Sequence, residues 1–119
     1  MKVLFAIAVM FSMATVSNMY TFGYGINDAF WRVVWAIDEG TIWAESFNEE
    51  NFSKIKLGME DEVVLKLIGR PLELVKDYDA VEETWIYTKQ DSGTSDYDQR
   101  VIIFRKNKVF KIIKSFYID

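Results

Sequence analysis

The sequence has 119 residues, half of them hydrophobic and 16% aromatic, so it can form one small packed domain with a targeting segment. It contains no cysteine and no histidine, which excludes disulfides, thiol and imidazole nucleophiles and the usual zinc ligands. The formal net charge of −4 is unevenly distributed, because residues 1–99 carry 8 basic and 17 acidic side chains whereas residues 100–119 carry 6 basic and 1 acidic.

The N-terminus has the features of a membrane-targeting segment. Lys2 is followed by 25 uncharged residues, 3–27, and the first part of this stretch is almost wholly apolar. A cleaved secretory signal is one interpretation, because small residues suit a signal peptidase at two places, Ser12 with Ala14 and Thr15 with Ser17. An uncleaved transmembrane anchor is another, because about 20 apolar residues cross the hydrocarbon layer. A buried core helix is the third.

The first two interpretations both leave Lys2 on the cytoplasmic side and carry the rest of the chain across a membrane. We therefore expect residues 1–25 to be a signal peptide or a transmembrane anchor. The protein is expected in the cell envelope, either membrane-anchored or secreted to the periplasm.

A second apolar run, residues 29–37, lies between Asp28 and Asp38. Nine residues are too few to span a bilayer. The run is either an interfacial segment that places Trp31 and Trp35 at the lipid headgroups, or a short helix or strand that covers the core. Residues 26–46 are accordingly expected to form an aromatic-rich linker or interfacial segment.

A first short helix is predicted at the start of the folded domain, which is expected to cover residues 47–119. This helix spans residues 47–55, with Asn48 as its N-cap and acidic side chains in its first turn. Phe47 and Phe52 are spaced to pack on each other as a hydrophobic staple.

A second short helix is predicted between Gly58 and Pro71. Its first turn carries the acidic triplet Glu60, Asp61 and Glu62, which the helix dipole favours. Its apolar face consists of Val63, Val64, Leu67 and Ile68. Gly69 can take the left-handed position that ends a helix, and Pro71 prevents continuation.

Beyond Pro71 the apolar period changes to that of strands. Strands are predicted at residues 83–88, 100–105 and 108–117, with Lys106 and Asn107 as a two-residue hairpin turn. Residues 72–78 are either a short strand or an extended connection, and residues 90–98 are expected to be a polar loop. Trp85 and Tyr87 alternate on one face and are expected in the core.

The expected fold is therefore α+β, with two short helices packed on a three-stranded antiparallel sheet in the order ααβββ. An N-terminal apolar signal or anchor helix precedes this domain.

No pattern in the sequence indicates catalysis, a metal or a cofactor. The acidic triplet is explained by its place at a helix N-terminus, and residues 91–98 lack the spacing of a calcium loop. A nucleophile elbow, a phosphate loop and a dinucleotide fingerprint are all missing from the sequence. We expect no catalytic residue, no metal site and no cofactor.

The C-terminal basic excess is the candidate binding surface. It consists of Arg100, Arg105, Lys106, Lys108, Lys111 and Lys114. A patch of one sign attracts an acidic protein or anionic lipid, although a solvated sheet face with a hairpin tip explains the same residues. Nucleic acid is not expected as a partner of an acidic, exported protein.

Several of these residues occur together in a known pattern. The pattern comprises Phe52 to Met59, then Val63, Leu67, Gly69 and Pro71, then Trp85 to Tyr87, then a hairpin that joins Phe104 to Val109 and Ile112. In these features residues 48–116 resemble the SmpA/OmlA (BamE-like) family, small lipoproteins of outer-membrane β-barrel assembly. The resemblance implies two helices on a three-stranded antiparallel sheet, a place in the periplasm, and binding or scaffolding work without catalysis. The chain lacks the cysteine through which family lipoproteins are lipidated.

The expected function is that of a non-enzymatic envelope protein that binds or scaffolds other envelope proteins, in outer-membrane protein assembly or envelope maintenance. One alternative is peripheral binding of anionic lipid by the basic patch together with Trp31 and Trp35. Another is an inhibitor-like module that binds a protein.

Overall fold

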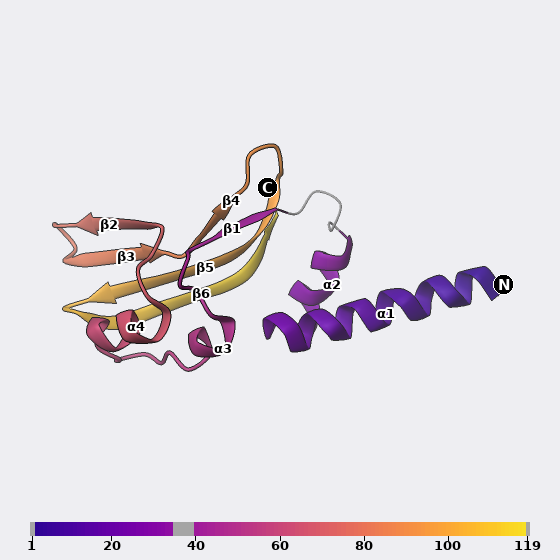
Figure 1. The fold of residues 1–119 in the computed structure, drawn as a ribbon, viewed down its shortest axis with the longest axis horizontal. Helices are drawn as coiled ribbons and strands as arrows, with labels where there is room; N and C mark the ends of the chain where they lie inside the picture. The colour runs from indigo at the N-terminus through magenta and orange to yellow at the C-terminus, as the bar shows by residue number, and fades with distance from the viewer. Residues whose placement is uncertain (1, 35–39, 119) are drawn as a thin grey trace.

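The molecule is elongated, with principal extents of 59 × 29 × 24 Å, and one long helix projects from its end (Figure 1). It is described by a computed structural model, which covers residues 2–34 and 40–118. The helix–sheet part occupies the other end, and the N-terminus lies at the tip of the projecting helix.

The projecting helix, α1 (Lys2–Phe22), is followed by a second helix, α2 (Ile26–Val34). Gly23 separates them with a φ of 66°, a left-handed conformation that glycine adopts without steric cost. The short turn lets α2 fold back along the C-terminal half of α1, where Ala29 is fully buried. Of the described helices, α1 is the one long and apolar enough to cross a membrane, and a secretion signal would meet the same criteria.

The main sheet is antiparallel and has four strands in the order β2-β3-β5-β6, where three strands were predicted. The strands are β2 (Glu73–Asp77), β3 (Glu82–Ile86), β5 (Asp96–Arg105) and β6 (Lys108–Ile118). The extra strand is β2, so the segment 72–78 contains a strand, residues 73–77, and is not merely an extended connection. Every residue of β2 is exposed, and an edge strand of this kind has no apolar alternation to mark it.

A second antiparallel pair joins β1 (Thr41–Trp43) to β4 (Thr88–Gln90). It was not predicted, because each strand has only three residues and the two lie far apart in the chain. β1 also lies within the segment that was expected to be a linker.

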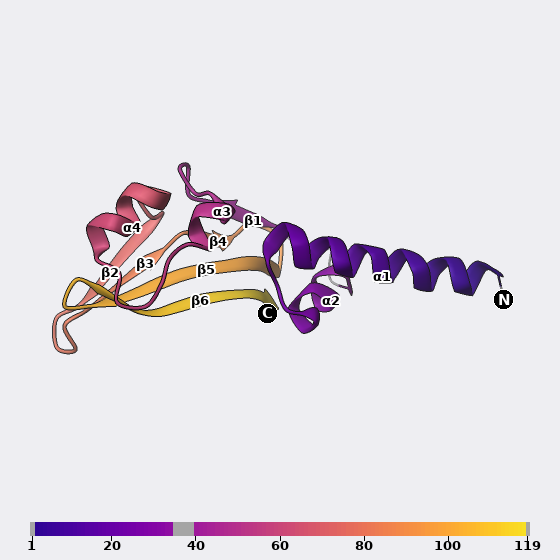
Figure 2. The same cartoon turned by 90° about the horizontal axis from the view of Figure 1, so that it is seen from below.

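Two short helices, α3 (Glu49–Phe52) and α4 (Asp61–Ile68), cover one face of the sheet (Figure 2). The Asn48 side chain caps α3 by accepting a hydrogen bond from the Asn51 N–H, as predicted. The rings of Phe47 and Phe52 lie 5.4 Å apart, which confirms the staple. α3 is shorter than the predicted 47–55, because Lys54 and Ile55 close onto carbonyls three residues back in a tighter turn.

The packing of α4 follows its apolar face only in part. Val64 and Ile68 are fully buried, whereas Val63 is 42% exposed. Gly69 ends the helix with a φ of 73°, and a Cβ there would meet the Ser46 side chain at 2.4 Å. The end of α4 therefore requires glycine for two reasons, the positive φ and the lack of space for a Cβ atom.

The core lies between α3, α4 and the sheet, and it contains Phe52, Val64, Ile68, Trp85, Tyr87, Ile102, Phe104 and Val109. Trp85 and Tyr87 are buried, as predicted. The Tyr87 hydroxyl donates a hydrogen bond of 2.8 Å to the Gly69 carbonyl, which ties the sheet to the end of α4.

The hairpin between β5 and β6 turns at Lys106 and Asn107, whose φ angles are 51° and 65°. Two successive positive φ angles are those of the tight turn predicted here. β5 begins at Asp96, four residues before the predicted start, so Asp96 to Asp98 belong to the sheet and not to a polar loop.

Candidate functional site

The structure divides the predicted basic patch. Arg100 has no exposed side-chain surface, and its guanidinium pairs with Glu49 at 2.6 Å. Lys114 is also partly buried beside Glu49, with 3.7 Å between the charged atoms. Arg100 is therefore not exposed as the predicted surface requires, because alternate residues of a strand face inward and Arg100 shares its side of β5 with the core residues Ile102 and Phe104. For the partly exposed Lys114, a role in binding stays a prediction.

The other four basic residues, Arg105, Lys106, Lys108 and Lys111, are exposed at or near the β5–β6 turn. Arg105 forms an ion pair of 2.6 Å with Glu82 and covers the ring of Phe110 at 3.8 Å. Lys106 lies in the turn and Lys108 follows it; both are exposed, and they line a surface hollow together with the acidic triplet of α4.

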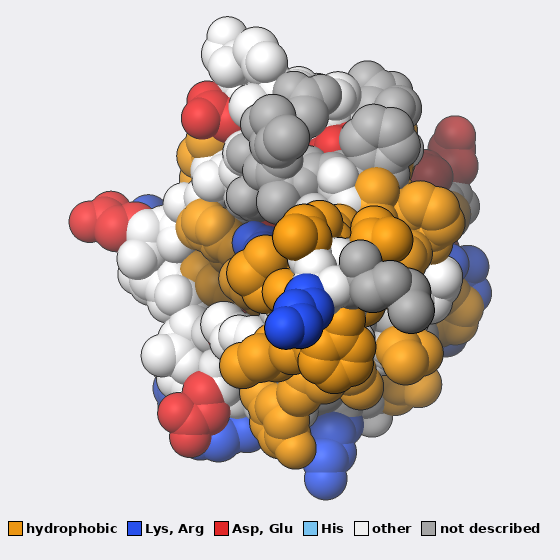
Figure 3. Space-filling view, turned by 90° about the vertical axis from the view of Figure 1, so that its right-hand side faces the viewer, with side chains coloured by type: hydrophobic (Ala, Val, Ile, Leu, Met, Phe, Trp, Pro, Cys, Tyr) orange, Lys and Arg blue, Asp and Glu red, His pale blue; other side chains and the backbone are white. Residues whose placement is uncertain are grey.

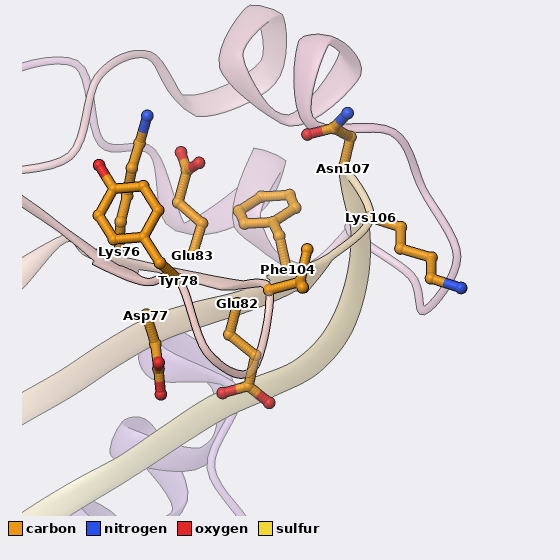
Figure 4. Close-up of a pocket in the computed structure, with 9 residues that line it drawn as sticks. Lys76, Asp77, Tyr78, Glu82, Glu83, Phe104, Lys106 and Asn107 are labelled. Carbon is orange, nitrogen blue, oxygen red and sulfur yellow. The ribbon is translucent and has the colours of Figure 1, made fainter.

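A cavity of about 230 Å³ lies beside this turn (Figure 4). It is lined by Lys76, Asp77, Tyr78, Val81, Glu82, Glu83, Phe104, Lys106 and Asn107. Tyr78 is 83% exposed, and Val81 has a φ of 55°, which β-branched residues rarely adopt. Strained, exposed residues of this kind often occur where proteins bind partners. The two hairpin turns together form what we call the tip, defined by residues 77–83 and 105–108.

A network of buried polar side chains lies at the opposite end of the sheet, where α1 and α2 meet β5. Its centre is Asp98, which is fully buried. The Asp98 carboxylate accepts hydrogen bonds from the Tyr24 hydroxyl, from Arg32 Nε at 3.0 Å and from Thr41 Oγ1 at 3.4 Å. Arg32 also donates to Asn18 Oδ1 at 3.2 Å, so the last turns of α1 join the network.

The network continues from Tyr24 to the buried cation. Arg100 Nη1 donates to the Tyr24 hydroxyl at 2.9 Å, and Arg100 Nη2 and Nε donate to Glu49 of α3. Burial tends to lower the pKa of Arg100, but the hydrogen bonds with Glu49 and the contact with Tyr24 raise it above its ordinary value. The network therefore links α1, α2, α3 and β5 through a charged centre, which we call the polar hub.

Burial also changes the pKa of two neighbours of the polar hub. Desolvation raises the pKa of the Tyr24 hydroxyl far above its ordinary value, so this group keeps its proton. Desolvation lowers the pKa of the Lys114 ammonium, and pairing with Glu49 offsets only part of that effect.

Trp31 is 41% exposed on α2, and its indole N–H donates to Asn27 Oδ1. Trp35, the other predicted aromatic site residue, lies outside the described residues. α2 and the β5–β6 turn lie at opposite ends of the molecule (Figure 1), so Trp31 and the basic turn do not form one surface.

Within 2–34 and 40–118, no group of three or more His, Cys, Asp or Glu side chains is placed to hold a metal ion. The acidic triplet lies in the N-terminal turn of α4, where Asp61 accepts a hydrogen bond from the Glu62 N–H.

The sequence analysis missed the polar hub. The sequence did not predict that four residues from separate segments would meet, because their contact depends on the tertiary fold. These residues are Tyr24, Arg32, Glu49 and Asp98. One signal was present: the period of two that places Ile102 and Phe104 inward also places Arg100 and Asp98 inward.

No protein-family model matches the chain, and no curated protein or solved structure shows significant similarity to it. The class that the fold itself defines is a mixed α+β protein with two antiparallel sheets and an N-terminal apolar helix compatible with a signal or a membrane anchor. The resemblance to the SmpA/OmlA family stays a prediction.

Proposed function

We propose that the protein is a non-enzymatic envelope protein, anchored in a membrane by an uncleaved α1, that binds another protein with its tip. The observation that carries this proposal is the polar hub, because it joins the end of α1 to the folded domain. Asn18, Phe22 and Tyr24 are parts of that fold, since Arg32 bonds Asn18 and stacks over the Phe22 ring at 3.9 Å.

The hub favours an anchor over a cleaved signal. Both candidate cleavage sites lie inside the continuous helix α1, and Thr15 is buried there. Proteases cut exposed, flexible segments more readily than packed helices. In this proposal Lys2 lies on the cytoplasmic side, so the domain lies on the opposite side of that membrane.

The tip is supported as the binding surface by its position and its side chains. It lies at the end of the molecule opposite α1, so a membrane that holds α1 leaves it accessible (Figure 1). It combines the exposed Tyr78 and Val81 with Lys106 and Lys108, a mixture of aromatic, apolar and basic groups that suits a partner with an acidic rim. The partner is another envelope protein, in outer-membrane protein assembly or envelope maintenance.

The test is crosslinking in intact cells that express the full chain. The double variant Lys106→Glu/Lys108→Glu leaves the Arg105–Glu82 pair intact and should abolish the crosslinked product. Lys54→Glu/Lys56→Glu is the matched control, because it makes the same charge change with the same spacing on the exposed loop after α3. Unchanged crosslinking of the folded tip variant would remove the tip from the proposal. A native N-terminus at residue 15 or 18, measured by mass spectrometry, would remove the anchor.

Anionic lipid is less well supported as a ligand of the basic residues. Arg100 and Lys114 are engaged inside the domain, and the turn that carries Lys106 and Lys108 points away from α1. An inhibitor-like role remains compatible with the tip, and identification of the crosslinked partner would distinguish it from scaffolding.

A further inference from the structure

A groove of about 480 Å³ lies between α1 and α2. Its walls include Phe11, Val16 and Met19 from α1, and Ile26 and Phe30 from α2. Ile26 is 70% exposed and Phe30 is 43% exposed, so α2 leaves large apolar side chains uncovered. Figure 3 shows hydrophobic side chains gathered over the end of the molecule from which α1 projects.

The two faces of α2 differ in chemistry. Arg32 lies on the face toward the sheet, where it pairs with Asp98. Ile26, Phe30 and Val34 recur at a spacing of four residues and therefore share the opposite side of the helix. An amphipathic helix with one engaged polar face and one open apolar face is typical of segments that lie in a membrane interface.

Three polar side-chain atoms in the groove form hydrogen bonds within α1 and α2. The Ser12 and Thr15 hydroxyls donate to carbonyls four residues earlier, at 2.9 and 2.8 Å. Asn27 accepts the hydrogen bond of the Trp31 indole. These two hydroxyls and the Asn27 amide oxygen are therefore satisfied within the two helices, which lowers the cost of placing them in a lipid environment.

We propose that α2 lies in the outer leaflet of the membrane that holds α1, and that a lipid acyl chain occupies the α1–α2 groove. This inference rests on the proposed anchoring by α1. The argument for lipid is continuity, because the groove opens onto the exposed apolar surface of α1. Trp31 lies at the edge of the apolar face, and tryptophan is enriched at the membrane–water interface.

The groove carries no cationic side chain among its lining residues. The acyl chain, and not the headgroup charge, is therefore what α2 recognises. Association of α2 with the bilayer should depend little on anionic lipid or on salt.

The experiment uses the full chain reconstituted in phosphatidylcholine vesicles, with and without phosphatidylglycerol. The natural chain has no cysteine, so a single introduced cysteine can be spin-labelled without background. Phe30→Cys and, separately, Ile26→Cys test α2. Phe5→Cys in α1 is the lipid control, and Tyr78→Cys at the tip is the water control, since these two side chains are 73% and 83% exposed.

Labels at 30 and 26 should collide with oxygen more often than with a water-soluble nickel chelate, and the label at 5 should do the same. For each label, the ratio of oxygen to nickel collisions should be equal in both kinds of vesicle. A label at 78 should show the reverse. Two labels in α2 keep the test informative if one variant does not fold.

If the label at 5 is in lipid but the labels at 30 and 26 are exposed to water, this inference is overturned and the anchor stays intact. Lipid exposure at 30 and 26 that requires phosphatidylglycerol would overturn the acyl-chain assignment in favour of headgroup attraction. A wet label at 5 would overturn the anchor and this inference together.

Discussion

Replacing Asp98 by asparagine should destabilise the domain by about 3 kcal/mol. The Asp98 carboxylate is buried and accepts from Tyr24, Arg32 and Thr41. Asparagine keeps the size but removes the charge, so the ion pair between this position and the Arg32 guanidinium is lost. Breaking a buried ion pair by removing one member costs about 3–5 kcal/mol. The lower end applies because Arg32 retains 17% exposure of its side chain. For a chain of this length the loss corresponds to a melting temperature about 10 °C lower.

The assay is urea unfolding in detergent micelles, followed by near-ultraviolet circular dichroism. A double-mutant cycle with Arg32→Met separates the ion pair from the other bonds of Asp98. With Arg32 already removed, Asp98→Asn should cost at least about 1 kcal/mol less than it does alone. Asp79→Asn is the matched control, because Asp79 is exposed in the β2–β3 turn and should change stability by less than about 0.5 kcal/mol.

Two results would refute this reasoning. One is a cost below about 1 kcal/mol for Asp98→Asn, which would mean that the carboxylate is not the centre of the polar hub. The other is additivity of the two substitutions, which would mean that Arg32 and Asp98 do not interact energetically.

Three further predictions concern the domain itself, and each is measured by chemical unfolding. Gly69→Ala should lower the free energy of unfolding by about 2–4 kcal/mol, because it combines a φ of 73° with a steric clash. Gly58→Ala should lower it by only about 1 kcal/mol, because no atom lies near the added methyl group. Equal losses for the two variants would contradict the clash at Gly69. Ile68→Ala should cost about 2–5 kcal/mol through the cavity left in the core, and a smaller loss would show that this site collapses. Burial raises the pKa of Tyr24 and Tyr87, so the folded state keeps two protons that the unfolded state loses above about pH 10. The tyrosine contribution to stability is therefore complete below that pH and falls above it by up to about 2.7 kcal/mol per pH unit. Ionisation of all six tyrosines near pH 10 in the native protein, measured by tyrosinate absorbance, would contradict this.

Features set by neighbouring residues were predictable from the sequence. The cap at Asn48, the end of α4 at Gly69 and the turn at Lys106 and Asn107 each depend on a few adjacent side chains. The burial of Trp85 and Tyr87 followed from alternation in a strand of β-branched and aromatic residues.

Features that depend on distant partners were not predictable in the same way. β2 has no apolar alternation, so only its pairing with β3 identifies it as a strand. Asp98 was assigned to a loop because a run of polar residues is usually solvated, and here Tyr24 and Arg32 compensate for its burial. Arg100 was assigned to the surface for the same reason, although Glu49 neutralises it inside the domain.

The polar hub holds the end of α1 against β5, and under the proposed anchoring this contact sets the distance between the membrane and the tip. α1 and β5 both run along the long axis of the molecule in Figures 1 and 2. The ten residues of β5 rise about 33 Å at roughly 3.3 Å per residue, so in the proposed anchored protein the turn at their end is held about that far from the polar hub. In the proposed function the protein is then a spacer that presents the tip at that level, and longer strands would change the distance at which it meets a partner.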